Sequence, residues 1–178
     1  EFEPSQEDIR SEQEFPHPEF DYHTITNDIA LIKLRHQPSA FTQPGYACLP
    51  SASYTPPRDQ LCTIVGWGKL KNTHFYGSNS LQEAQVPVVR HRKCERVFDY
   101  VITQKQVCAG YKKGGKDSCA GDSGGPLLCS WEDGNTTKYV IYGVTSYGEG
   151  CGRKGKYGIY TKVASYRDWI DKTISENS

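Results

Sequence analysis

The chain has 178 residues with 21 acidic and 21 basic side chains, so its formal net charge is zero. This length suffices for a substantial core, and the composition is not that of a disordered chain. No uninterrupted apolar stretch is long enough to span a bilayer, and we expect neither a membrane span nor a nucleic-acid partner.

Seven cysteines and the absence of methionine indicate a processed chain from an oxidising, extracellular compartment. The sequon Asn135-Thr136-Thr137 agrees with a secreted glycoprotein, and Asn135 is the predicted glycosylation site. Because seven is odd, at least one cysteine is unpaired or bonds to another chain. We expect the N-terminus to result from cleavage or truncation.

Short β-branched or aromatic runs follow one another along the chain, separated by clusters of Gly, Pro, Asn and Ser. The predicted strands are 29–34, 62–67, 81–89, 126–131, 138–145 and 157–163. Many short strands at close spacing favour an antiparallel sandwich or barrel. The polar stretch 69–80 has no periodicity, so we expect an exposed loop that proteases nick.

The last segment of the chain has the pattern of a helix. Ser165 is a candidate N-cap with Asp168 three residues later. An apolar stripe occurs at helical spacing, formed by Val163, Tyr166, Trp169, Ile170 and Ile174. The sequence therefore predicts a C-terminal helix that packs on the core.

The charges are unevenly distributed along the chain. Residues 1–28 hold nine acids against Arg10 alone, whereas 90–116 hold eight basic residues against two acids. The acidic stretch could form a calcium loop, since hard cations take carboxylate ligands, but a solvated acidic edge is favoured. The basic stretch could steer an anionic partner such as heparin or an acidic protein surface, but scattered surface lysines are favoured.

Residues 121–126 have the sequence Gly-Asp-Ser-Gly-Gly-Pro, which makes Ser123 a candidate nucleophile. A serine hydroxyl needs an adjacent general base to attack a carbonyl, and histidine is the usual one near neutral pH. All five histidines precede Ser123. This excludes the order of serine, acid and histidine that α/β-hydrolases have.

Several segments together resemble the chymotrypsin-like (trypsin-type) serine endopeptidases. They occur in the order of that family: 27–34, 47–50, 66–68, 107–110, 117–126, 160–163 and 169–170. The resemblance implies an all-β fold, a chymotrypsin-like double antiparallel β-barrel with a C-terminal α-helix and the active site between the barrels. About 1–50 would be the remainder of the first barrel, about 51–163 the complete second barrel, and 164–174 the helix.

The family's Ile/Val-Val-Gly-Gly start and its Ala-Ala-His-Cys block are absent from this chain. The catalytic histidine would therefore come from a missing N-terminal segment, and we expect the isolated chain to be inactive. His23 lies five residues before Asp28, but its neighbours do not resemble the histidine block, so we expect a loop histidine near the cleft rim. The resemblance makes Asp28 the buried carboxylate that orients the imidazole; a strand-capping aspartate is the alternative.

The resemblance also assigns roles around the nucleophile. Ser123 would attack the scissile carbonyl, while the backbone N–H groups of Gly121 and Ser123 bind the developing oxyanion. Asp122 would form the activation salt bridge with the α-amino group that zymogen cleavage releases. Because an unpaired buried carboxylate is costly, we expect a poorly formed active site in this chain alone.

The same resemblance implies a substrate pocket that selects Arg or Lys. Asp117 would lie at its base, and Ser118 would help to bind a lysine ammonium. Gly148 and Gly158 would line the walls and leave room for a long side chain.

Two tyrosines depart from the usual trypsin pattern. Ser146, Tyr147 and Gly148 resemble the strand segment that pairs with the substrate backbone, and Tyr147 replaces the usual tryptophan, which should alter the adjacent apolar subsite. Tyr157 replaces the usual proline. Within the family, tyrosine at this place accompanies a Na⁺ site formed by nearby carbonyls, and a tyrosine packed beside the loop is the alternative. No cofactor is required for the expected chemistry.

Spacing alone does not determine how the cysteines pair. The resemblance selects three disulfides, Cys62 with Cys129, Cys94 with Cys108, and Cys119 with Cys151. Cys48 remains, and in many multi-chain relatives the matching cysteine bonds to a light or pro chain. A free buried thiol is the alternative.

These observations predict a secreted trypsin-like serine endopeptidase, made as a zymogen, that cleaves after Arg or Lys. Tyr157 and Cys48 favour limited proteolysis in a clotting, complement or immune cascade, with a disulfide-linked chain and macromolecular protease inhibitors as partners. The alternative is a non-catalytic protease homologue that acts as a binding or regulatory module.

Overall fold

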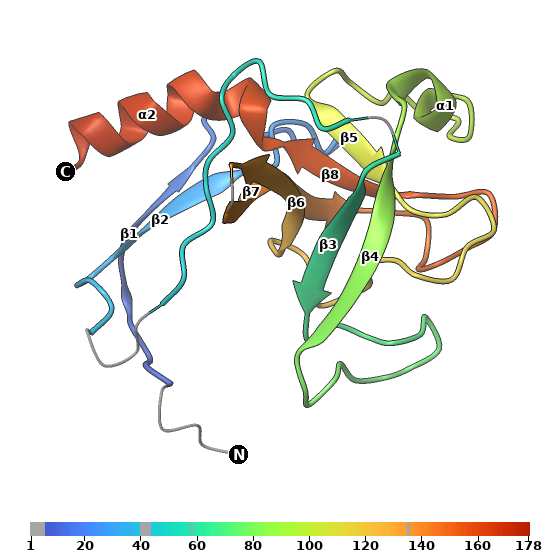
Figure 1. Cartoon of the computed structure of the whole chain (residues 1–178), viewed down its shortest axis with the longest axis horizontal. Helices are drawn as coiled ribbons and strands as arrows, with labels where there is room; N and C mark the ends of the chain where they lie inside the picture. The colour runs from blue at the N-terminus through green and yellow to red at the C-terminus, as the bar shows by residue number, and fades with distance from the viewer. Residues whose placement is uncertain (1–5, 40–43, 58, 135) are drawn as a thin grey trace.

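The computed structural model describes residues 6–39, 44–57, 59–134 and 136–178. The described chain consists of a two-stranded sheet, a closed six-stranded barrel and a C-terminal helix (Figure 1). The predicted all-β class and the C-terminal helix are confirmed, and the arrangement agrees with the second barrel of a chymotrypsin-like fold together with part of the first. The predicted glycosylation site, Asn135, lies outside the described residues.

The six strands of the barrel are all antiparallel to their neighbours. They are β3 (Leu61–Gly66), β4 (Gln82–Val89), β5 (Gln106–Ala109), β6 (Pro126–Asp133), β7 (Thr136–Tyr147) and β8 (Gly158–Lys162). Around the barrel the order is β3-β4-β5-β8-β7-β6, and β6 pairs again with β3. β5 was not among the predicted strands because its four residues are too few to show an alternating pattern.

The barrel is filled by apolar side chains from every strand. Its core consists of Cys62, Ile64, Val86, Ala109, Leu127, Cys129, Tyr142 and Tyr160. On β3 the buried side chains are two residues apart, as expected for a strand with one face toward the interior. Each fully buried large apolar side chain contributes about 1.5–3 kcal/mol, so this core holds the strands that carry the site.

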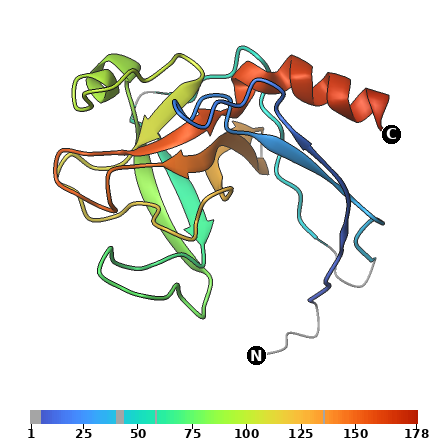
Figure 2. The same cartoon turned by 180° about the vertical axis from the view of Figure 1, so that it is seen from behind.

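A second, smaller sheet pairs β1 (Ser11–Pro16) with β2 (Ala30–Leu34). β1 is largely polar, and only its pairing with β2 reveals it as a strand. Ile29 and Leu31 pack against the segment that follows β8. This packing joins the small sheet to the C-terminal helix. Figures 1 and 2 show this sheet beside the barrel, with the helix lying across one end of it.

The C-terminal helix α2 (Arg167–Glu176) follows a 3₁₀ turn at Val163–Tyr166. The predicted cap is wrong, because Ser165 lies within the 3₁₀ turn and Tyr166 precedes the helix without a side-chain cap. Packing of Val163 and Tyr166 against the core holds the chain in this turn. Of the predicted apolar stripe, Val163, Tyr166 and Ile170 are buried, Trp169 is partly buried, and Ile174 is half exposed.

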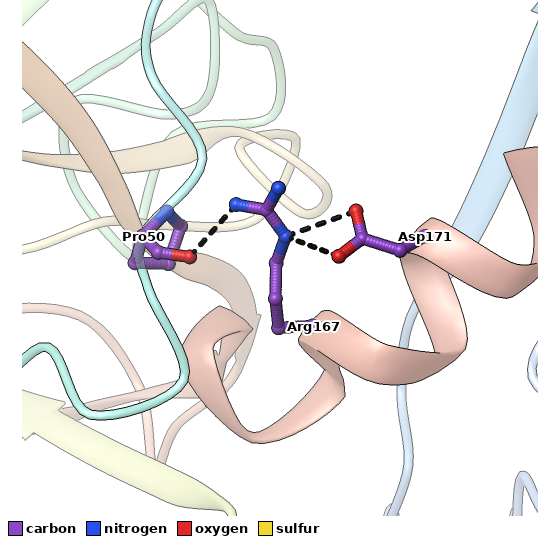
Figure 3. Close-up of polar contacts among 3 residues, drawn as sticks. All are labelled: Pro50, Arg167 and Asp171. Atoms are coloured by element: carbon purple, nitrogen blue, oxygen red, sulfur yellow. Dashed lines mark hydrogen bonds and ion pairs between the residues drawn. The ribbon is translucent and has the colours of Figure 1, made fainter.

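Arg167 ties the start of α2 to the segment 44–57, which runs along the barrel. Its Nε donates to both carboxylate oxygens of Asp171, at 3.0 and 2.9 Å, and its Nη1 donates to the carbonyl of Pro50 at 3.1 Å (Figure 3). The same segment pairs with β7, where the N–H of Cys48 donates to the carbonyl of Tyr139 at 2.7 Å. These bonds fix the connection between the small sheet and the barrel.

The structure contains the three disulfides that the resemblance implies, Cys62–Cys129, Cys94–Cys108 and Cys119–Cys151. Cys94 belongs to a short helix, α1 (His91–Glu95), that the sequence did not predict. Cys48 is a free and exposed thiol, so the alternative of a buried thiol is wrong. In the described ranges, no helix has both the length and the apolar character needed to cross a membrane.

Candidate active site

Ser123 lies on two consecutive tight turns. The N–H of Asp122 donates to the carbonyl of Cys119, and the N–H of Gly125 donates to the carbonyl of Asp122, both at 2.9 Å. Gly121 has a φ of 98°, a conformation that side chains other than glycine rarely adopt. These turns leave Ser123 exposed at the rim of a cavity.

Two backbone donors at this turn remain available to a ligand. The N–H groups of Gly121 and Ser123 have no hydrogen-bond acceptor among the described residues, although the N–H of Asp122 between them has one. A Cβ on residue 121 would lie 3.1 Å from the Cα of Gly68, so glycine fits this close approach. Unpaired backbone N–H donors at a nucleophile are the groups that stabilise an oxyanion.

The carboxylate of Asp122 is held against the end of β3. Its Oδ1 accepts the N–H of Gly68 at 2.7 Å, and its Oδ2 accepts the N–H of Cys119 at 2.9 Å. A Cβ on Gly66 or Gly68 would collide with this carboxylate, which accounts for a glycine on each side of Trp67. The sequence showed these glycines only as a family landmark, and the structure identifies them as the cradle of Asp122.

A cavity of about 260 Å³ borders the same carboxylate, between the end of β3, the start of β4 and the segment 115–118. Among the described residues, Asp122 forms no ion pair, and the donors that reach it are neutral backbone N–H groups. The expected cost of burying this carboxylate is therefore partly offset within the chain, because these two hydrogen bonds stabilise its charged form.

Asp28, two residues before β2, is held by two strands of the barrel. The hydroxyl of Ser146 on β7 donates to Oδ2 of Asp28 at 2.6 Å, and the hydroxyl of Thr161 on β8 donates to its carbonyl at 2.7 Å. The preceding Asn27 has a φ of 55° and accepts the hydroxyl of Tyr166 at 3.0 Å. The sequence analysis gave Ser146 a role in substrate pairing and missed its hydrogen bond to Asp28.

His23 lies in the exposed turn between Asp21 and Thr26. Its backbone N–H donates to Oδ1 of Asp21 at 2.8 Å, and none of its contacts within the described part of the chain reaches Asp28 or Ser123. It is thus a loop histidine, as expected. His17 lies elsewhere, with its ring buried against Tyr166 and Trp169.

One cavity of about 280 Å³ adjoins Ser123. It is lined by all six predicted substrate-binding residues, Asp117, Ser118, Ser146, Tyr147, Gly148 and Gly158. The Cys119–Cys151 disulfide joins the two segments that form its walls. The structure thus brings together residues that lie far apart in the sequence, from Asp117 to Gly158.

Asp117 is the acidic group of this cavity. Its carboxylate accepts the N–H of Ser118 and the N–H of Gly152, both at 2.9 Å. Burial raises the pKa of Asp117 to about 6, although these two hydrogen bonds act to lower it. A cation bound beside Asp117 would stabilise the ionised carboxylate and lower that pKa again.

Small residues leave space around this carboxylate. A Cβ on Gly158 would lie 2.8 Å from Oδ1 of Asp117 and 3.0 Å from the ring of Tyr160. The hydroxyl of Ser118 is 2.9 Å from that of Tyr160, which holds the serine at the pocket wall. A Cβ on Gly148 would make only ordinary van der Waals contacts, so this glycine contributes to the pocket by leaving space there.

Tyr147 is anchored by a buried glutamine that the sequence analysis did not single out. Gln106 Nε2 donates to the hydroxyl of Tyr147 and to the carbonyl of Ile25, both at 3.2 Å. The ring of Tyr100 lies 6.1 Å from that of Tyr147, which lines the pocket. Burial raises the pKa of Tyr100 to about 12.

Asn72, from the loop 69–80, also lines the pocket. Its Oδ1 lies 3.5 Å from Sγ of Cys151; this is a contact and not a hydrogen bond, because a disulfide sulfur carries no hydrogen. No motif in the loop indicated this residue, since its role depends on how the loop folds back over the disulfide.

The sequence suggested two ion sites, one for sodium near Tyr157 and one for calcium in the acidic stretch 1–28. Tyr157 is buried with Phe98 and Ile159, as expected for a tyrosine packed beside the loop, and the sodium site stays a prediction. Within the described ranges, no three His, Cys, Asp or Glu side chains converge in a way that could hold a metal ion. The calcium loop at 1–28 also stays a prediction.

Comparison with known proteins identifies relatives across nearly the whole chain. A sequence model of one family, described as Trypsin, matches residues 1–170. Serine protease 56 of Mus musculus is 41% identical over 95% of this chain, which covers 28% of that relative. Anionic trypsin of Bos taurus is 40% identical over 91% of the chain, and Trypsin V-A of Rattus norvegicus 39% identical over 90%. The chain spans 62% and 61% of these two trypsins.

Proposed function

Because the chain belongs to the trypsin family of serine proteases, we propose that it is part of an endopeptidase that cleaves after Arg or Lys. The observation that carries this proposal is the carboxylate of Asp117, which lies in a cavity of about 280 Å³ that also borders Ser123. A substrate residue whose long cationic side chain lies beside Asp117 would have its backbone carbonyl near the hydroxyl of Ser123.

In this proposal, Ser123 attacks the scissile carbonyl and the N–H groups of Gly121 and Ser123 stabilise the oxyanion. The general base is a histidine supplied by a segment outside this chain. Asp28 orients that histidine, and the 2.6 Å hydrogen bond from Ser146 fixes the carboxylate for this role. Removal of Ser146 would therefore act on catalysis through Asp28.

Activation would depend on Asp122. The α-amino group released by zymogen cleavage would enter the cavity of about 260 Å³ beside this carboxylate. The positive charge would add to the two backbone N–H donors, from Gly68 and Cys119, that already bind Asp122. Because Asp122 lies between the two oxyanion donors, fixing its carboxylate also fixes their direction.

The setting of the enzyme is also a proposal. Three disulfides fit a secreted protein, and the exposed thiol of Cys48 is accessible for a disulfide to a light or N-terminal chain. We place the enzyme in a regulated proteolytic cascade, with macromolecular inhibitors as further partners. Glycosylation at Asn135, sodium near Tyr157 and calcium at the acidic N-terminal stretch complete this hypothesis.

The test uses the activated longer protein that contains this chain. We expect it to hydrolyse peptide anilides that end in Arg or Lys at least 100-fold faster than the matching Phe anilide, and Ser123→Ala to abolish the reaction. A preference for Phe, or hydrolysis that survives Ser123→Ala, would refute the proposal. If activated protein neither hydrolyses these substrates nor reacts with a serine-directed phosphonate, the non-catalytic alternative holds.

Residues 1–178 alone form the matched control. We expect no hydrolysis from this chain, because none of its histidines within the described residues contacts Asp28 or Ser123. Measurable hydrolysis of the Arg anilide by the purified chain would instead assign the role of general base to a histidine of the chain itself, with His23 to be tested first by His23→Gln.

A further inference from the structure

A groove of about 650 Å³ lies on the barrel away from Ser123. It is formed by the end of β4, the segment that contains α1, and residues 110–112 after β5. Figure 1 shows α1 beside the ends of β4 and β5. Among the described lining residues, none is shared with the cavity at Ser123. This groove is therefore a separate feature from the site at Ser123.

Positive charge dominates the groove. Five basic residues line it, Arg90, Arg92, Lys93, Arg96 and Lys112, and all five are exposed. None of them forms an ion pair with another residue that the structure describes. Asp59 is the one acid among the described lining residues. Their contacts are weak, as for Lys93, whose Nζ lies 6.0 Å from the ring centre of Tyr157.

The neighbouring charges do not neutralise this surface. Glu95 of α1, whose Oε1 lies 3.1 Å from Nε2 of His91, carries one negative charge against the five positive charges of the groove. Lys113, next to the groove residue Lys112, is exposed and extends the positive charge along the same loop. Like charges held this close repel one another, so an anion that binds among them gains from every one.

We propose that this groove binds a sulfated polysaccharide. Arginine presents a planar fork of donors that suits the oxygens of a sulfate group, and three of the five basic residues are arginines. The groove provides a channel in which a linear chain can place successive sulfates against Arg90, Arg92 and Arg96. A polysaccharide of this kind is available in the extracellular compartment that the disulfides indicate.

The surface of the groove is unlike a docking site for a folded protein. Such sites have a core of exposed aromatic or large apolar side chains. The apolar and aromatic side chains that line the groove, Pro87, Val88, Val89 and Tyr111, are partly buried, and the exposed side chains at the groove are charged. The basic groove thus favours an extended polyanion over an apolar protein surface.

Polysaccharide binding here does not depend on catalysis. The groove and the pocket at Ser123 have separate linings, so a bound chain would leave the pocket open to a peptide. The proposal can therefore succeed whether or not the chain belongs to an active enzyme.

The test measures binding of a heparin hexasaccharide to the full chain by calorimetry in 50 to 200 mM NaCl. We expect Arg90→Gln with Arg92→Gln and Arg96→Gln to lower the affinity about 100-fold. The slope of log affinity against log salt should fall by about three, one for each cation removed. Arg10→Gln with Arg35→Gln and Lys172→Gln is the control, because it removes the same charge from exposed positions outside the groove.

Three outcomes would overturn the proposal. One is an equal loss of affinity in both triple variants, which would show that binding depends on the net charge of the chain and not on the groove. Another is tighter binding of an acidic peptide, such as hexaglutamate, than of the sulfated hexasaccharide. The third is unchanged binding in Lys112→Glu, a single variant that we expect to lower the affinity about tenfold and that tests the groove even if the triple variant unfolds.

Discussion

At the scale of single residues, the site combines a carboxylate that burial destabilises with donors that have no partner. Burial raises the pKa of Asp117 to about 6, so its carboxyl group is only partly ionised in mildly acidic solution. The N–H groups of Gly121 and Ser123 are left without acceptors among the described residues. The buried carboxylate therefore favours binding of a cationic side chain, and the unpaired N–H groups favour binding of a developing oxyanion.

The pH dependence of ligand binding follows from the pKa of Asp117. A raised pKa means that the carboxyl group is protonated below about pH 6, and a protonated acid does not attract a cation. The ionised fraction falls from about 0.9 at pH 7 to about 0.1 at pH 5, so we expect benzamidine to bind about tenfold more weakly at pH 5.

Fluorescence titration with p-aminobenzamidine, which stays cationic over this range, measures the effect. Ser123→Ala is the control and should keep the same pH profile, since a serine hydroxyl does not titrate there. Equal affinity at pH 5 and pH 7 would show that Asp117 is not the group that binds the amidine.

The space beside Asp117 can be tested with one methyl group. Gly158→Ala would place a Cβ 2.8 Å from the carboxylate, so we expect benzamidine to bind at least about tenfold more weakly. Gly45→Ala is the matched control, because nothing lies within 4 Å of its Cβ position. If both variants bind benzamidine like the parent chain, the pocket assignment is wrong.

At the scale of elements, the strands with a clear apolar pattern were predicted, and those without one were not. Observed β3 and β4 begin and end within one residue of the predicted 62–67 and 81–89. β1 and β5 were missed because one is polar and the other very short. The N-cap at Ser165 was wrong because packing of the neighbouring residues, which local sequence does not reveal, forms a 3₁₀ turn there.

The loop 69–80 is the element most open to proteolysis. Its exposed residues include Phe75 and Tyr76, whose exposed fractions are 89% and 85%. We expect chymotrypsin to make its first cut at this loop, because exposed aromatic residues there meet its preference while the barrel strands stay hydrogen-bonded.

Mass spectrometry of a short digest locates the cut. Phe75→Ser with Tyr76→Ser should slow the first cleavage several-fold, whereas Tyr46→Ser, at a site with an exposed fraction of 82%, serves as the control. A first cut within β3–β8 outside this loop would contradict the exposure that the structure shows.

At the scale of the whole molecule, the barrel and the small sheet differ in how they are supported. The barrel strands enclose a buried core and have no free edge, whereas in the described part of the chain β1 and β2 pair only with each other and are largely exposed. Because local stability follows burial and hydrogen bonding, the small sheet should open more readily than the barrel.

Hydrogen exchange provides the measurement. We expect the amides of β1 and β2 to exchange at least about 100-fold faster than those of β3 and β8, since their opening does not require the barrel to unfold. Arg167→Ala should speed exchange in the segment 44–57 that Arg167 ties to α2, and Lys172→Ala, on the same helix, should not. Equal exchange across all strands would mean that the chain unfolds as one unit.

The sequence by itself determined the kind of chemistry and the family to which it points. Ser123 in its glycine-rich turn, Asp28 before an apolar strand and the cysteine positions are local patterns, which a linear reading detects. The three disulfides and the six pocket residues then follow from the resemblance, and the structure brings each group together.

Only the tertiary structure decided how these residues support one another. The hydrogen bond from Ser146 to Asp28, the cradle that Gly66 and Gly68 form for Asp122, and the groove with its five basic residues each join positions far apart in the chain. The sequence favoured scattered surface lysines for 90–116, because linear spacing does not show which side chains share a surface. Closure of the barrel brings the end of β4 next to the end of β5, and that pairing places Lys112 beside the four basic residues of 90–96.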